Sequence, residues 1–187
     1  MTPILGIWAS STTSSKQNSY ESIATGITTA GGFIDFNSIP QTYTHLQIRI
    51  NGASAYSPGS GNLDCWVGLN NQTTAPTAGY THRLYGDGTN ASASSSSQTD
   101  LLNTGWLPFG FGASYTGALI IDILDYANTN KFKTIRSLGG YDANGSGYIS
   151  LVSGYSNITA AVSQIRVATN SGGYTAGTSI ALYGIKG

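Results

Sequence analysis

The stretch Tyr43-Thr-His-Leu-Gln-Ile-Arg-Ile50 decides the fold class of this chain. Apolar side chains stand at positions 46, 48 and 50, and polar side chains stand between them at 45, 47 and 49. Because successive side chains of a strand point to opposite faces of a sheet, this alternation is typical of a strand buried on one side. The chain is therefore predicted to build its core from sheets.

Similar stretches recur along the chain, and no long apolar repeat with helical spacing accompanies them. The further predicted strands are Tyr20–Ala24, Gly32–Phe36, Asp64–Leu69, Tyr80–Tyr85, Ala118–Leu124, Lys131–Leu138, Tyr148–Val152, Ala161–Val167 and Ser179–Gly187. Clusters of Gly, Asn, Ser and Pro separate them, a spacing typical of all-β sandwiches. We expect an all-β fold, a jelly-roll-like antiparallel β-sandwich with few or no helices.

Three segments carry more specific expectations. Ala118–Leu124 is apolar throughout except for Asp122, which predicts a strand buried between layers. Ala91–Gln98 has low complexity and is expected to form an exposed, mobile loop tip. Cys65 is the single cysteine of the chain, so no disulfide within the chain can form. Its strand context predicts a buried, structural thiol.

The length of 187 residues predicts one domain with an N-terminal appendage. Residues 1–18 are expected to form an N-terminal arm, or the first strand of the sandwich, with a Ser/Thr-rich linker at Ser10–Ser19. Residues 19–187 are expected to form a single β-sandwich domain. Apolar side chains cluster before the linker and are candidates for a docking arm: Ile4, Leu5, Ile7 and Trp8.

Charged residues are scarce and balanced. They make up 9% of the chain, with eight basic and eight acidic residues and a formal net charge of zero. Nucleic-acid binding needs a basic face, and attachment to a membrane surface needs a polybasic patch, so neither partner is expected. A near-neutral surface lacks the repulsion that keeps monomers apart, which favours a protein that assembles.

The sequence predicts no enzyme and no cofactor. The sequence contains no nucleophile elbow, no phosphate-binding loop, no zinc-protease motif and no paired cysteines. His45 and His82 each sit in an alternating strand pattern and are interpreted as outward-facing strand residues. The sequence displays no pair of acids typical of a sugar hydrolase.

One stretch, Asp142-Ala-Asn144-Gly-Ser146, admits two interpretations. Oxygen-bearing residues at its first, third and fifth positions resemble the start of a calcium loop, which makes Asp142, Asn144 and Ser146 candidate ligands of a weak site. The bidentate Glu that such a loop needs at position twelve is replaced by Ser153. The favoured alternative is a tight hairpin in which Asn144-Gly145 supplies positive φ angles. No metal is firmly predicted.

Aromatic residues are abundant for so uncharged a chain, with twelve tyrosines and three tryptophans. Several tyrosines lie near glycines and are expected in loops: Tyr56, Tyr115, Tyr141, Tyr155 and Tyr174. Such side chains build platforms for sugar rings and also build protein interfaces, so a glycan site and a protein contact both stay open.

Several segments resemble a group of small virion proteins of tailed bacteriophages. The similar segments are Pro3–Ser11, Ser19–Thr25, Phe36–Arg49, His82–Gly88, Ile121–Thr134 and Ala181–Gly187. The similarity extends over essentially the whole chain, in the order of that group. The resemblance implies a jelly-roll-like structural component of the virion, with no enzymatic activity.

The expected function is therefore that of a capsid decoration, or cement, protein. It would fold in the cytoplasm of the bacterial host, assemble as a homotrimer and dock on the major capsid protein. The single cysteine suits a reducing compartment of this kind. The alternative is a tail-fibre or receptor-binding module that recognises host surface glycans through Asn51–Asn62 and Gly139–Gly147.

Overall fold

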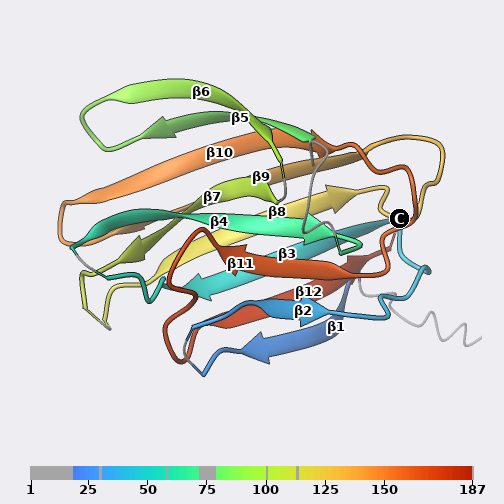
Figure 1. The fold of residues 1–187 in the computed structure, drawn as a ribbon, viewed down its shortest axis with the longest axis horizontal. Helices are drawn as coiled ribbons and strands as arrows, with labels where there is room; N and C mark the ends of the chain where they lie inside the picture. Colours follow the sequence, from blue (N-terminus) through green and yellow to red (C-terminus); the bar gives the residue numbers. More distant parts are fainter. Residues whose placement is uncertain are drawn as a thin grey trace, which may run out of the picture.

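The computed structural model describes residues 19–29, 31–57, 59–71, 79–99, 101–112 and 114–186, and within them it shows twelve strands and no helix (Figure 1). The strands are β1 Tyr20–Ile27, β2 Ile34–Phe36, β3 His45–Gly52, β4 Gly61–Leu69, β5 Gly79–Gly86, β6 Ala91–Gln98, β7 Leu102–Phe109, β8 Gly117–Leu124, β9 Lys133–Asp142, β10 Gly147–Ser156, β11 Ile165–Thr169 and β12 Ser179–Ile185. The proposed docking arm with Ile4, Leu5, Ile7 and Trp8 lies outside the described residues. In the described ranges no helix is long and apolar enough to span a membrane.

The strands form two antiparallel sheets with jelly-roll topology. The large sheet has the order β1-β12-β3-β8-β9-β10-β5-β6, and the small sheet has the order β2-β11-β4-β7. Without β5, β6, β9 and β10, the large sheet has the order β1-β12-β3-β8. In this order and in that of the small sheet, strands from early and late parts of the chain alternate. This alternation is the order that two nested Greek keys produce. The expected all-β, jelly-roll-like sandwich is confirmed.

Two additional hairpins widen the large sheet beyond the jelly roll. The β5–β6 hairpin lies between β4 and β7 in the chain, and the β9–β10 hairpin lies between β8 and β11. β9 pairs with β8, and β10 pairs with both β9 and β5, so the two hairpins continue one sheet. The large sheet therefore extends past the edge of the small one (Figure 1).

The hydrophobic core fills the space between the two sheets. Alternate side chains of β3 and β8 supply its centre, with Ile48 and Ile121 fully buried. Tyr126 and Tyr174 are the largest fully buried apolar side chains that the structure describes. Tyr174 comes from a segment predicted as loop, but it lies in the core with its hydroxyl 3.5 Å from the Cys65 sulfur.

Two sequence predictions about strands were wrong, and one strand was missed. Ala91–Gln98 is not a loop tip but strand β6, which pairs along its whole length with β5. Leu102–Phe109 forms β7. The sequence does not predict this strand because Gly105 and Pro108 interrupt its pattern. β8 is buried on one face only, since Ile120 is 45% exposed on the other. β6 and β7 are strands because β5 and β4 pair with them, and β8 has an exposed face because nothing among the described residues covers it.

Cys65 is fully buried, as predicted. Burial raises the pKa of its thiol from the ordinary value of 9.0 to about 11. The folded state therefore holds this proton more tightly than the unfolded state does. The resulting stabilisation is complete below pH 9 and is lost as the pH rises towards 11.

We expect Cys65→Ala to flatten the pH dependence of stability in this window. The difference between wild type and variant should change by about 2–3 kcal/mol between pH 9 and pH 11, because one pKa unit corresponds to about 1.4 kcal/mol. Urea unfolding at a series of pH values measures it. Titrating tyrosines are present in both proteins and largely cancel in the comparison. Parallel pH profiles would show that the thiol does not titrate differently in the two states.

Candidate docking face

Four aliphatic side chains form a straight row on the outer face of the large sheet. Leu151 of β10 lies opposite Leu84 of β5 on one side and opposite Leu138 of β9 on the other. Ile120 of β8 lies opposite Leu138 and completes the outer apolar row. The four side chains are exposed by 55% (Leu84), 45% (Leu151), 52% (Leu138) and 45% (Ile120). Contiguous apolar surface of this kind marks interaction sites more often than scattered exposed residues do.

Polar and charged side chains flank the outer apolar row. The neighbouring row runs through His82, Ser153, Arg136 and Asp122. Arg136 forms an ion pair of 3.0 Å with Asp122, so these two charges largely cancel. At the β3 end, Arg49 follows Ile120, and its guanidinium lies 4.6 Å from the centre of the Tyr183 ring. The apolar row therefore has a polar limit along this side and at its β3 end, while on its other side the exposed Ile149 of β10 extends the apolar surface.

Exposed aromatic rings lie beyond the polar row. Tyr80 of β5 lies opposite Tyr155 of β10. Phe132 stacks on Tyr155 with a centroid separation of 5.7 Å and an interplanar angle of 14°. Tyr155 thus belongs to a strand on the outer face and not to a loop, contrary to the sequence prediction.

β6 gives the large sheet an edge that nothing covers among the described residues. Its eight residues are Ala, Ser and Gln, carry no charge or proline, and pair with β5 without irregularity. The other edges carry features that discourage further pairing. β1 has an irregular register between Ser22 and Ala24, β2 has three residues, and β7 contains Pro108. The open edge adjoins the strand that carries Leu84.

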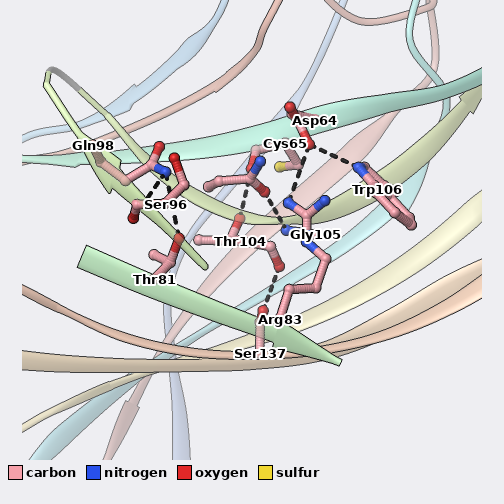
Figure 2. Close-up of polar contacts among 11 residues, drawn as sticks. Asp64, Cys65, Thr81, Arg83, Ser96, Gln98, Thr104, Gly105, Trp106 and Ser137 are labelled. Atoms are coloured by element: carbon pink, nitrogen blue, oxygen red, sulfur yellow. Dashed lines mark hydrogen bonds and ion pairs between the residues drawn. The ribbon is translucent and has the colours of Figure 1, made fainter. Parts of the chain in front are cut away.

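The widened end of the large sheet is fastened by polar contacts to the small sheet (Figure 2). Asp64 and Trp106 alternate with the core residues Cys65 and Leu107, so they lie on the face of the small sheet that points away from the core. Arg83 of β5 nevertheless reaches this face and pairs with Asp64 at 3.2 Å. The β5–β6 end of the large sheet must therefore wrap around β7.

Trp106 is the centre of this attachment. Its indole nitrogen donates a hydrogen bond of 2.7 Å to Asp64, and the Arg83 guanidinium lies 4.3 Å from the centre of its ring. Tyr85 of β5 and Tyr148 of β10 pack edge-on against it, with centroid separations of 4.8 and 5.1 Å. Next to it, the Ser137 hydroxyl donates to the Thr104 carbonyl and connects β9 to β7 (Figure 2). These contacts hold the strands that carry the outer apolar row.

The candidate calcium segment forms the predicted tight hairpin turn. Asn144 and Gly145 have φ angles of 59° and 86°, and the Ala143 amide donates to the Ser146 carbonyl at 2.7 Å. One carboxylate oxygen of Asp142 accepts from the Gly145 amide at 3.2 Å. In the described part of the chain, no group of three or more His, Cys, Asp or Glu side chains is placed to hold a metal. A calcium role for Asp142, Asn144 and Ser146 stays a prediction.

Strand residues form both ends of each segment named for glycan recognition. Asn51 and Gly52 end β3, and Gly139–Asp142 belongs to β9, so only their central residues are loops. A cleft of about 370 Å³ lies at this end of the sandwich, lined by Tyr56, Phe109, Phe111 and Tyr115 among others. Tyr141 contacts Phe111 at a centroid separation of 5.9 Å, and burial raises the pKa of Tyr141 to about 12.

The histidines differ in their surroundings. The Nδ1 atom of His45 accepts a hydrogen bond of 2.9 Å from the Asp125 amide, which fixes the turn after β8. His82 is exposed in the polar row, with its ring 5.5 Å from that of Tyr80. The sequence does not predict that His82 and Leu84 share a sheet face with Leu138 and Ile120, because this depends on the register between strands.

No protein-family model, no curated protein and no solved structure matches this chain.

Proposed function

We propose that this protein is a structural protein of a bacteriophage virion that works by docking. Its leading role in this proposal is that of a capsid decoration protein that contacts the major capsid protein. The outer apolar row carries the proposal, because four in-register aliphatic side chains are exposed on one face, and three of them lie on the two hairpins added to the jelly roll. Burying the exposed half of each side chain in a contact is worth about 1 kcal/mol.

The rest of the surface supports assembly. The zero net charge removes repulsion between protein copies, and the uncovered β6 edge offers backbone groups for strand pairing. The homotrimer and the contact through Ile4, Leu5, Ile7 and Trp8 belong to the same proposal and stay predictions. The outer apolar row gives a docking surface that does not depend on that arm.

Lysine in place of Leu84 and Leu138 is expected to abolish incorporation into phage particles. Each substitution should weaken docking by about tenfold or more, since 1.4 kcal/mol corresponds to tenfold in affinity. Ile27→Lys is the matched control, because Ile27 is 68% exposed on β1 at the opposite edge of the same sheet. Mass spectrometry of purified virions measures the copy number, and circular dichroism confirms that each variant folds.

Normal incorporation of the double variant would contradict docking through the outer apolar row. Immunogold electron microscopy of whole virions locates the wild-type protein in the same experiment. Label over the head, at the copy number of the capsid lattice, supports decoration. Label confined to the tail would instead support the tail-fibre or receptor-binding alternative.

A further inference from the structure

A polar pocket of about 260 Å³ lies where the β5–β6 hairpin wraps over the small sheet. Its floor is formed by Asp64 and Trp66 of β4 and by Asn103 of β7, on the face of the small sheet that points away from the core. Its wall is formed by Thr81 and Arg83 of β5 and by serines of β6. Figure 2 shows Arg83 reaching from β5 to Asp64 at this site.

Two buried donors of the pocket residues have no hydrogen-bond partner among the described residues. They are the indole nitrogen Nε1 of Trp66 and the guanidinium nitrogen Nε of Arg83. A buried donor without a partner costs about 1–3 kcal/mol, and nearly all such groups in folded proteins are satisfied. One donor comes from the floor and the other from the wall. Acceptor oxygens bound between the two sheets would satisfy both.

The charges of the pocket favour a neutral ligand. Among the described residues of its lining, the charged ones are Asp64 and Arg83, which pair with each other at 3.2 Å. The remaining polar groups are hydroxyls and amides, which both donate and accept hydrogen bonds. They are Thr81, Ser94, Ser95, Ser96, Gln98 and Asn103. A ligand with several neighbouring hydroxyl groups matches this set.

We propose that this pocket binds one ring of a neutral sugar, whose oxygens accept hydrogen bonds from Trp66 and Arg83. The volume lies below the about 300–1,000 Å³ of sites for drug-sized ligands, which fits a single ring. Arg83 and Leu84 are adjacent on β5 and point to opposite faces of the sheet. The pocket therefore lies on the reverse side of the hairpin from the outer apolar row, and sugar binding does not depend on the proposed docking.

Titration of the ¹⁵N-labelled full chain with glucose, galactose, mannose and N-acetylglucosamine tests this proposal. At least one of these sugars should shift the indole N–H signal of Trp66 and the Nε–H signal of Arg83 with a common saturation curve. The chain has three tryptophans, and the Trp66→Phe variant assigns the signal. The same variant keeps an aromatic ring but lacks the donor, so its affinity should fall by about tenfold.

Two controls isolate the pocket. Ser153→Ala removes a hydroxyl on the outer face of β10 and should leave binding unchanged. Glucuronate, the charged counterpart of glucose, should bind more weakly than the neutral sugars because the pocket has no unpaired charge among its described lining residues.

The wild-type titration decides the proposal even if Trp66→Phe does not fold. If no sugar moves either signal, the two donors are satisfied by water and the proposal is wrong. Tighter binding of glucuronate, or sugar binding that leaves both donor signals in place, would also overturn it. None of these outcomes bears on docking, which the leucine variants test on the other face.

Discussion

Lys133→Met is expected to lower the free energy of unfolding by about 3–5 kcal/mol. Lys133 is fully buried at the start of β9, and its ammonium group donates hydrogen bonds to three backbone carbonyls. Two carbonyls belong to Asn128 and Lys131 in the loop before β9, and the third belongs to Thr159 in the loop after β10. Methionine fills a similar volume but leaves these carbonyls without their donor.

Lys131→Met provides the matched control for this prediction. Lys131 lies two residues away, its side chain is 56% exposed, and it pairs with Asp125 at the surface. Exposed ion pairs contribute about 0–1 kcal/mol, so this variant should unfold nearly like the wild type. Urea unfolding measures both. If the two variants lose the same stability, Lys133 does not connect the two loops in the way the structure indicates.

Trp106→Ala is expected to have an effect of similar size, a loss of about 3–5 kcal/mol. The variant removes the ring that Tyr85, Tyr148 and Arg83 contact, together with the hydrogen bond to Asp64. The loss should fall mainly on the attachment of the β5–β6 and β9–β10 hairpins. Amide hydrogen exchange should therefore accelerate more in β5 and β10 than in β1 and β12.

Trp106→Phe separates the ring contacts from the hydrogen bond. It keeps an aromatic ring between Tyr85 and Tyr148 but removes the indole nitrogen, so only about 1.5–3 kcal/mol should be lost. Uniform acceleration of exchange over all strands in Trp106→Ala would contradict a local role. It would mean that the added hairpins and the jelly roll unfold as one unit.

Individual strands with a buried face could be predicted from the sequence. The alternation in Tyr43–Ile50 comes from the two-residue repeat of a strand, and the structure places β3 there. The turn at Asn144-Gly145 could be predicted for a similarly local reason, because these two residue types tolerate positive φ angles. Cys65 could be placed in the interior from its immediate neighbours.

β6 could not be predicted because its residues have weak strand preferences of their own. Ala and Ser do not favour strands, and all eight positions of β6 except the last are exposed. The segment is a strand because β5 pairs with it along its whole length. Ala118–Leu124 has apolar side chains on both faces, which predicts a strand buried on both sides. The structure covers only one face, because the sequence pattern does not determine what packs against each face.

The amino-acid sequence by itself determined that this chain folds into sheets, with the tight turn at Asn144-Gly145 and the buried thiol of Cys65, because each depends on residues close together in the chain. Only the tertiary structure decided that Leu84, Leu151, Leu138 and Ile120 share one row and that Trp66 and Arg83 meet across a pocket. Both groupings depend on strand register and on the wrapping of β5 around β7. These are contacts between distant segments, and local side-chain patterns do not encode them.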